Sequence, residues 1–166
     1  MSRALDFLSL ALASGLFLSH FPVRLFPQGT AGRKWTGAGL VGTLWGLALL
    51  PLVPEGTRGF WIFYGAALAL AVAVSTRAER VYGNKDDQRI VIDETVGYWA
   101  AVAFLPRRFG VLAAGFALFR IFDAAKVPPF RWFERLPRGW GVVFDDVAAG
   151  AAANAILIGV VRHGWL

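Results

Sequence analysis

The sequence of 166 residues contains no cysteine. Neither a disulfide framework nor a thiolate metal site can therefore form, and any bound metal must take oxygen or nitrogen ligands. Histidine is also scarce. His20 and His163 are the two histidines, and both lie near expected helix ends, away from the acidic motifs described below. We therefore do not expect a histidine to act as the general base of a catalytic site.

Charged residues are few as well. They make up 17% of the sequence against 57% hydrophobic residues, and the mean hydropathy of +0.54 is too high for an ordinary soluble domain. This composition predicts a polytopic membrane protein. A formal charge of +6 raises the question of nucleic-acid binding, but no basic-aromatic binding module is visible, and we expect no nucleic-acid partner. Basic loops that face anionic lipid headgroups explain the charge more simply.

Six apolar runs predict an all-α membrane bundle of about six transmembrane or membrane-embedded helices, folded as a single domain over residues 1–166. The runs cover residues 4–21, 35–53, 60–75, 90–106, 109–122 and 142–161. A full span needs about 20 apolar residues, so the fifth run is short and is expected to tilt, kink or thin the bilayer. The first run is expected to be a retained helix that ends at Phe21 and Pro22, because the sequence lacks the pattern of a signal peptide.

The distribution of lysine and arginine predicts the orientation in the membrane. If the runs alternate across the bilayer, one side receives the polar loops 22–34, 76–89 and 123–139, with three, four and four of these residues. The other side receives the N-terminus, 54–59, 107–108 and the C-terminus, with one, one, two and one. The positive-inside rule places the first side in the cytoplasm.

This topology brings five carboxylates from three helix ends to the cytoplasmic boundary. They are Asp93, Glu94, Asp123, Asp145 and Asp146. Close carboxylates repel one another, and in a low dielectric they either protonate or bind a cation. A hard divalent cation with oxygen ligands, Mg²⁺ above all, fits such a set. Adjacent residues on a helix point about 100° apart, so one acid of each adjacent pair can instead cap a helix or orient a partner.

Two cations accompany these acids, Arg120 and Lys126. Arg120 lies one helical turn from Asp123, so its guanidinium can lie beside that carboxylate. An arginine that also faces a metal-bound anion is suited to bind phosphate oxygens in a bidentate way, and Lys126 can add a point charge. Simpler interpretations stay open: Asp145 and Asp146 can cap a helix N-terminus, and the two cations can extend to lipid headgroups.

Three motifs follow one another between about residues 86 and 150: IVIDETVG, then AGFALFRIFDAAK followed by PFRWFER, then GWGVVFDDVAAG. They resemble the D-E-x-x-G, F-R-x-F-D-x-x-K-P and G-x-G-x-x-x-D-D-x-x-A-G motifs of the phosphatidylglycerophosphatase A family. The resemblance implies a Mg²⁺-dependent phosphatase of a bacterial-type inner (cytoplasmic) membrane, with phosphatidylglycerophosphate as substrate, phosphatidylglycerol as product and an active site that faces the cytoplasm. By position it implies catalytic and metal-binding roles for Asp93, Glu94, Asp123, Asp145 and Asp146, and phosphate-binding roles for Arg120 and Lys126.

The chain departs from these motifs at two places. Val127 follows Lys126 where the family usually has proline. The nearest match to the P-G-T-x-G-S motif of the family is AGLVGTL, which keeps Gly39, Gly42 and Thr43 but has Ala38 and Leu40 in place of the proline and the threonine. We therefore assign no residue of the first half of the chain to the site.

The residues leave two reaction paths open: direct attack by water that a carboxylate activates, or initial attack by an aspartate to give an acyl phosphate. Two other functions stay as alternatives. One is a phosphatase for another phosphorylated lipid or an isoprenoid monophosphate. The other is a non-enzymatic transporter or scaffold whose acids bind a coupling ion. Transporters usually place such acids near mid-membrane, whereas these acids gather at one face.

Overall fold

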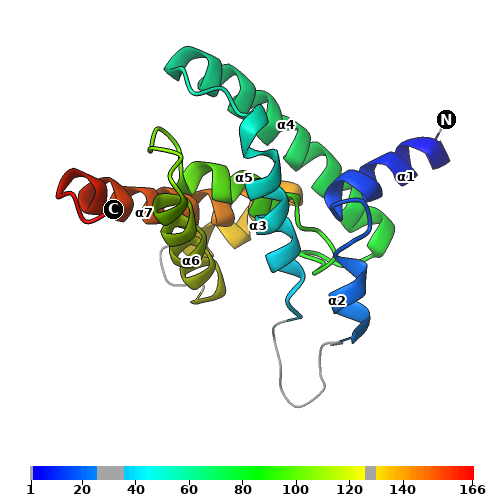
Figure 1. The fold of residues 1–166 in the computed structure, drawn as a ribbon. Helices are drawn as coiled ribbons and strands as arrows, with labels where there is room; N and C mark the ends of the chain where they lie inside the picture. Colours follow the sequence, from blue (N-terminus) through cyan, green and yellow to red (C-terminus); the bar gives the residue numbers. More distant parts are fainter. Residues whose placement is uncertain (1, 26–35, 126–129) are drawn as a thin grey trace.

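A computed structural model gives the fold and describes residues 2–25, 36–125 and 130–166 (Figure 1). Within these ranges the chain forms seven α-helices, two 3₁₀ helices and no β-strand, which confirms the predicted all-α class. The elements are α1 (Ser2–Ala13), α2 (His20–Leu25), α3 (Ala38–Leu49), η2 (Leu50–Leu52), α4 (Thr57–Tyr82), α5 (Ile92–Ala101), α6 (Phe109–Ala125), η3 (Phe130–Arg135) and α7 (Gly139–Arg162). The short helix α5 lies near the middle of the molecule and contacts α3, α4, α6 and α7.

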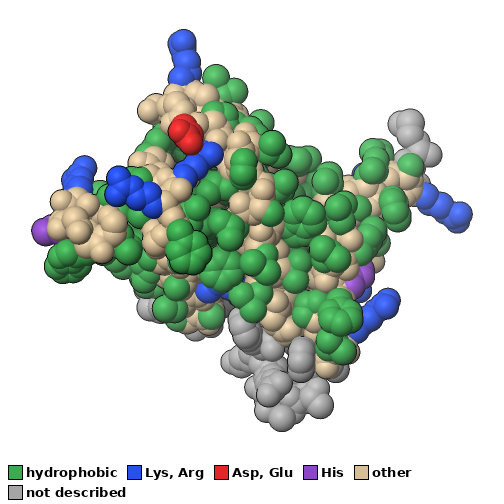
Figure 2. Space-filling view, in the orientation of Figure 1, with side chains coloured by type: hydrophobic (Ala, Val, Ile, Leu, Met, Phe, Trp, Pro, Cys, Tyr) green, Lys and Arg blue, Asp and Glu red, His purple; other side chains and the backbone are tan. Residues whose placement is uncertain are grey.

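Two of the described helices, α4 and α7, are long and apolar enough to cross a membrane. The other α-helices in the described ranges have 6 to 17 residues. The described part of the chain therefore has two candidate membrane spans, and the six predicted spans are not shown. Figure 2 shows a face covered largely by hydrophobic side chains, with most of its lysine and arginine side chains near the edges. Such a large apolar surface suits association with a membrane.

The first apolar run forms two helices instead of the single helix predicted over residues 4–21. Helix α1 ends at Ala13, and Leu16 and Phe17 then adopt left-handed backbone conformations with φ of 55° and 65°, which an α-helix cannot continue. The prediction that Pro22 ends a helix is wrong. Pro22 lies in the first turn of α2, where its missing N–H leaves no helical hydrogen bond unmade.

The predicted polar loop over residues 76–89 is shorter than expected, because α4 continues to Tyr82. Gly83 ends this helix: it adopts a left-handed conformation with φ of 76°, and its N–H donates to the carbonyl of Glu79. The polar residues of the last two turns of α4 therefore belong to a helix and not to a loop.

The fourth apolar run is helical only over the ten residues of α5. At its C-terminal end, the side-chain amide of Asn154 donates hydrogen bonds to the carbonyls of Ala101 and Ala103, at 3.0 and 2.9 Å. These bonds satisfy carbonyl groups near the point where the helix stops. A ten-residue helix is about 15 Å long, so α5 cannot cross a bilayer by itself.

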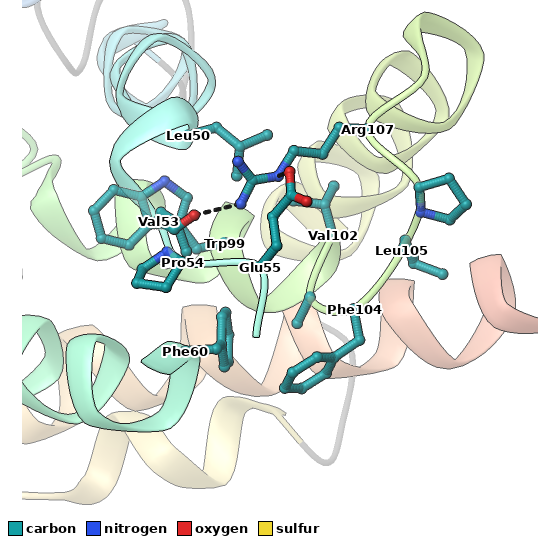
Figure 3. Close-up of a pocket in the computed structure, with 12 residues that line it drawn as sticks. Leu50, Val53, Pro54, Glu55, Phe60, Trp99, Val102, Phe104, Leu105 and Arg107 are labelled. Carbon is teal, nitrogen blue, oxygen red and sulfur yellow. Dashed lines mark hydrogen bonds and ion pairs between the residues drawn. The ribbon is translucent and has the colours of Figure 1, made fainter. Parts of the chain in front are cut away.

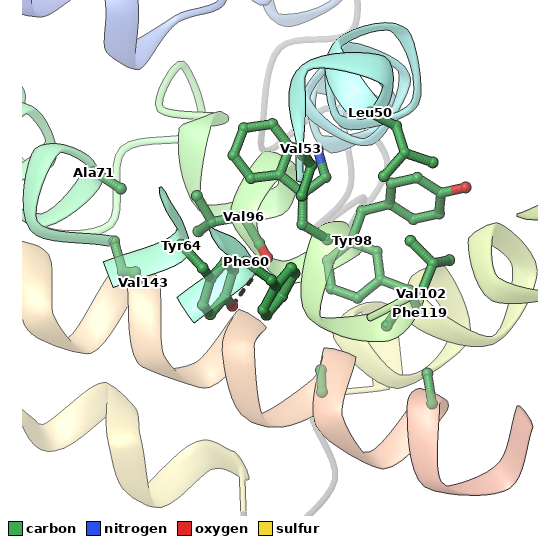
Figure 4. Close-up of a cluster of buried hydrophobic side chains, with 14 of the residues drawn as sticks. Leu50, Val53, Phe60, Tyr64, Ala71, Val96, Tyr98, Val102, Phe119 and Val143 are labelled. Carbon is green, nitrogen blue, oxygen red and sulfur yellow. Dashed lines mark hydrogen bonds between the residues drawn. The ribbon is translucent and has the colours of Figure 1, made fainter. Parts of the chain in front are cut away.

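The larger cluster of buried side chains surrounds α5 (Figure 4). The polar atoms of its aromatic residues are bonded to nearby backbone. Tyr64 Oη donates to the carbonyl of Val96 at 3.1 Å, and Trp99 Nε1 donates to the carbonyl of Gly46 at 2.8 Å. Burying a polar group costs little free energy when the group has a hydrogen-bond partner. These two bonds therefore link α3 and α4 to α5 and leave no unsatisfied donor on either ring.

Helices α5 and α7 cross with their backbones in contact. A Cβ atom at Gly150 would overlap the carbonyl oxygen of Gly97. A Cβ atom at Gly97 would lie 2.8 Å from the ring of Phe119 and 3.0 Å from Cβ of Asp146. Because neither glycine has a side chain, the helices approach closely enough to bring Asp146 next to the start of α5.

Candidate metal and phosphate site

Three carboxylates meet at the crossing of α5 and α7. Asp93 and Glu94 lie in the first turn of α5, and Asp146 lies in the third turn of α7. One carboxylate oxygen from each residue lies within 4.8 Å of the other two. Asp93 and Asp146 are only 6% and 4% exposed. The structure thus brings together three of the five predicted carboxylates, from two of the three predicted helix ends.

The oxygens of this acid trio have unfilled bonding capacity. Asp93 Oδ1, Glu94 Oε2 and Asp146 Oδ2 are buried and have no hydrogen-bond partner among the described residues. Asp93 and Asp146 are buried and Glu94 is partly buried, and the three acids carry three negative charges when all are ionised. Unpartnered carboxylate oxygens in a converging set are the ligands that hard divalent cations take. The trio can therefore hold a metal ion.

Electrostatics at the start of α5 disfavour the ionised acids. Burial, followed by the neighbouring Glu94 carboxylate, raises the pKa of Asp93 well above its usual range. Burial and the Asp123 carboxylate also raise the pKa of Glu94 to about 7, although the Arg120 guanidinium opposes this rise. A bound cation would reverse both shifts, because it stabilises the charged forms.

Arg120 of α6 joins the trio to the fourth predicted acid. Its Nη1 lies 2.8 Å from Asp123 Oδ2 and 3.9 Å from Glu94 Oε1, and the arginine side chain is 10% exposed. The first distance confirms the predicted pairing of Arg120 with Asp123 across one helical turn. Asp123 is thus a partner of the arginine and lies outside the acid trio.

Asp145 and Lys126 take other positions. Asp145 lies outside the trio, and its Oδ1 accepts the backbone N–H of Asp146 at 3.1 Å. The interpretation that Asp145 and Asp146 cap a helix N-terminus is wrong, because α7 begins at Gly139, well before them. Lys126 lies outside the described residues, so its predicted phosphate contact stays a prediction.

The first half of the chain reaches the site through α3, which the sequence did not predict. Thr43 is fully buried, and its Oγ1 lies 3.4 Å from Arg120 Nη1. A Cβ atom at Gly39 would overlap Glu94 Oε1 and lie 2.7 Å from Arg120 Nη1. The sequence feature that could have predicted this contact is the spacing of Gly39, Gly42 and Thr43, which puts all three residues on one helix face.

A cavity of about 360 Å³ lies elsewhere, where the segments after η2 and after α5 meet (Figure 3). Apolar side chains that include Phe60 and Trp99 line it. At its edge Arg107 donates a hydrogen bond to the carbonyl of Val53 and lies 3.5 Å from Glu55. Among the predicted site residues that the structure describes, none lines this cavity, and the acid trio with Arg120 forms the candidate site.

Comparisons with known proteins bear on what this site does. The family model described as Phosphatidylglycerophosphatase A matches residues 17–161. Phosphatidylglycerophosphatase A of Escherichia coli (strain K12) is 33% identical over 130 residues, 75% of each chain. The protein of the same name from Haemophilus influenzae (strain ATCC 51907 / DSM 11121 / KW20 / Rd) is 35% identical over 133 residues, 79% of each chain.

A third relative carries a different name. A Bacteroides thetaiotaomicron protein named "Putative phosphatidylinositol-3-phosphatase" is 35% identical over 163 residues, 95% of each chain. No solved structure matches the chain. The range of the family match contains all three motifs, the acid trio, Arg120 and Thr43. The chain belongs to the phosphatidylglycerophosphatase A family and is an enzyme of that family.

Proposed function

We propose that this enzyme hydrolyses the phosphomonoester of phosphatidylglycerophosphate to give phosphatidylglycerol and inorganic phosphate. Membership of the family supports this reaction. The observation that carries it for this chain is the convergence of three carboxylates, two of them buried and Glu94 partly buried, beside a buried arginine. A cation site next to a phosphate-binding arginine is what hydrolysis of a phosphomonoester needs.

We assign Mg²⁺ as the metal, with Asp93, Glu94 and Asp146 as its ligands. Their unpartnered buried oxygens support this assignment, and the absence of cysteine from the sequence favours a hard cation. Bound Mg²⁺ supplies positive charge that offsets the negative charge of the phosphate as the reaction proceeds. Asp123 and Asp145 complete the proposed set of catalytic carboxylates, with Asp123 holding Arg120 and Asp145 bonded beside Asp146.

Arg120 is the proposed phosphate ligand, with Lys126 as a second one. Arg120 Nη1 is held by Asp123 at 2.8 Å and lies 3.9 Å from Glu94, so the orientation of the guanidinium is restricted before substrate arrives. A planar guanidinium presents several N–H groups, and two of them can bind two phosphate oxygens at once. Restricting its orientation in advance lowers the entropic cost of that contact.

The reaction balances without a further reactant. The oxygen of water forms a bond to phosphorus, the bond between phosphorus and the glycerol oxygen breaks, and that glycerol oxygen takes a proton. The nucleophile is either the water itself, deprotonated by a carboxylate, or an aspartate whose acyl phosphate water then hydrolyses. Rapid quenching with labelled substrate separates the two paths: a trapped phosphoenzyme requires the aspartate, and no labelled protein supports direct attack.

The proposed setting is a bacterial-type inner membrane, with residues 1–166 as one membrane-embedded, multi-pass domain. Helices α4 and α7 are the candidate spans, and we place the shorter apolar helices around them in the membrane. The loops rich in lysine and arginine would face the cytoplasm by the positive-inside rule. The start of α5 and its two acids then lie at the cytoplasmic boundary, where the phosphorylated headgroup of a membrane lipid is accessible.

Another phosphorylated lipid is the second candidate substrate, because the relative with 95% coverage is named for phosphatidylinositol 3-phosphate chemistry. The site geometry recognises a phosphomonoester and does not by itself choose the headgroup. Membership of an enzyme family removes the earlier alternative of a non-enzymatic transporter or scaffold.

Phosphate release tests the proposal. The purified full chain in mixed micelles would be given phosphatidylglycerophosphate or phosphatidylinositol 3-phosphate, each with Mg²⁺. We expect a much higher kcat/KM with phosphatidylglycerophosphate. A higher kcat/KM with phosphatidylinositol 3-phosphate would make that lipid the proposed substrate. If neither lipid releases phosphate, the proposed phosphatase function is refuted.

A further inference from the structure

Thr43 lies where α3 passes the candidate site. Gly39, Gly42 and Thr43 share one face of α3, and this face lies against the start of α5 and the end of α6. Because Gly39 and Gly42 have no side chains, Thr43 presents the only side-chain polar group of the three. Its side chain is fully buried, so its hydroxyl must bond to protein groups and not to bulk solvent.

The Thr43 hydroxyl has one proton to donate, and that proton already forms a hydrogen bond within α3. Thr43 Oγ1 donates it to the carbonyl of Gly39 at 2.9 Å, one turn back in the same helix. Toward Arg120 Nη1, at 3.4 Å, the oxygen can therefore only accept. A fixed acceptor opposite a guanidinium N–H restricts rotation of the arginine. Asp123 Oδ2 lies 2.8 Å from the same Nη1 nitrogen, so residues of both α3 and α6 fix this end of the guanidinium.

Gly39 makes this arrangement possible. A side chain at this position would occupy the space of the Glu94 carboxylate and of the Arg120 guanidinium. The face of α3 is therefore shaped to receive the arginine and the glutamate together. The contact reaches 77 residues along the chain, from α3 to α6.

We propose that Thr43 is a positioning residue that holds the Arg120 guanidinium in the orientation in which it binds the substrate phosphate. This inference rests on the proposed function, because it takes Arg120 as the phosphate ligand. It extends the site to a third helix, α3, and gives the first half of the chain a role in catalysis. Thr43 itself need not touch the substrate.

The test compares Thr43→Val, which keeps the shape and removes the acceptor, with Thr43→Ser, which restores it. The matched control is Thr95→Val. Thr95 is also a buried threonine, and its Oγ1 lies 2.9 Å from the carbonyl oxygen of Gly42 and 3.3 Å from that of Val91, both of them backbone acceptors. Each variant is measured for kcat and KM on phosphatidylglycerophosphate and for thermal stability. Each is also measured for the concentration of inorganic phosphate that half-saturates its thermal stabilisation in the presence of Mg²⁺.

A lost hydrogen bond to a charged group corresponds to a factor of about 10 to 100. We expect Thr43→Val to lose about that factor in kcat/KM and to need a correspondingly higher phosphate concentration. Thr43→Ser should stay within about threefold of wild type in both, since it restores the bond. Thr95→Val should lose about as much thermal stability as Thr43→Val does. Its kcat/KM and the phosphate concentration that half-saturates its thermal stabilisation should stay at the wild-type values.

Three results would overturn the inference: wild-type phosphate affinity in Thr43→Val, equal losses of affinity in Thr43→Val and Thr95→Val, or no phosphate binding by the wild type. The phosphate measurement does not depend on which lipid is the substrate. If the wild type binds phosphate but does not hydrolyse phosphatidylglycerophosphate, the proposed reaction fails while the phosphate measurement still decides the role of Thr43.

Discussion

Replacing Glu94 by glutamine should stabilise the metal-free protein while it removes a ligand of the proposed metal site. Burial and the Asp123 carboxylate raise the pKa of Glu94 from an ordinary value of 4.5 to about 7. Between these two pH values the folded state binds a proton more tightly than the unfolded state. The free energy of unfolding of the metal-free protein should therefore fall as the pH rises from about 4.5 to about 7, and stay low above that window.

The size of this effect follows from the pKa shift. Each pKa unit corresponds to about 1.4 kcal/mol, so an ionised Glu94 costs the metal-free folded state about 3 kcal/mol at pH 8. Glutamine carries no charge and avoids this cost. Metal-free Glu94→Gln should exceed the wild type by about 3 kcal/mol at pH 8, or roughly 6 to 12 °C in Tm, and by little at pH 5.

Thermal unfolding of the detergent-solubilised chain with a chelator, at pH 5 and pH 8, measures this difference. Glu55→Gln is the matched control, because the Glu55 side chain is 77% exposed and the substitution removes a surface charge, not an interior one. Added Mg²⁺ should stabilise the wild type more at pH 8 than at pH 5, since protons compete with the metal. A Glu94→Gln variant that is less stable than the wild type at both pH values would refute the electrostatic account.

Other predictions concern the helix crossing and the site. Gly150→Ala should lower the free energy of unfolding by about 2 kcal/mol or more, because its Cβ meets the backbone of α5; Gly65→Ala, with open space around it, should change thermal unfolding little. Arg120→Lys should lower kcat/KM by about 10- to 100-fold, since an ammonium cannot reproduce the two-pronged contact, and a change below threefold would contradict that role. Asp146→Asn should weaken Mg²⁺ binding at least about tenfold by calorimetry, and unchanged binding would exclude it as a ligand.

The second half of the chain was predictable because its chemistry is local. The motifs placed Arg120 one turn from Asp123, and that pairing is present at 2.8 Å. The motifs also identified Asp93, Glu94 and Asp146, which meet in the structure. Which acids of the adjacent pairs would converge depended on the angle between α5 and α7. The close approach of these helices depends on backbone contact at Gly97 and Gly150, and the pattern of charged residues in the sequence does not predict that contact.

The first half was less predictable, because its structure depends on backbone conformation and tertiary contact. The apolar run 4–21 gives no sign that Leu16 and Phe17 take left-handed conformations, so one long helix was predicted where two short ones form. The role of α3 depends on what lies opposite it. Glycine-rich helices pack closely in many membrane proteins, and only the fold shows that Gly39 and Thr43 meet Glu94 and Arg120.

The dependence of phosphate release on Mg²⁺ decides whether the acid trio acts through a bound metal ion. Wild type and Asp146→Asn, each stripped of metal by a chelator, would be titrated with Mg²⁺ while phosphate release from phosphatidylglycerophosphate is recorded. We expect no release by the stripped wild type, saturable recovery with Mg²⁺, and a loss of at least about 100-fold in Asp146→Asn at the same concentrations. Full activity of the stripped wild type, or the same Mg²⁺ response in Asp146→Asn, would contradict this role of the acid trio.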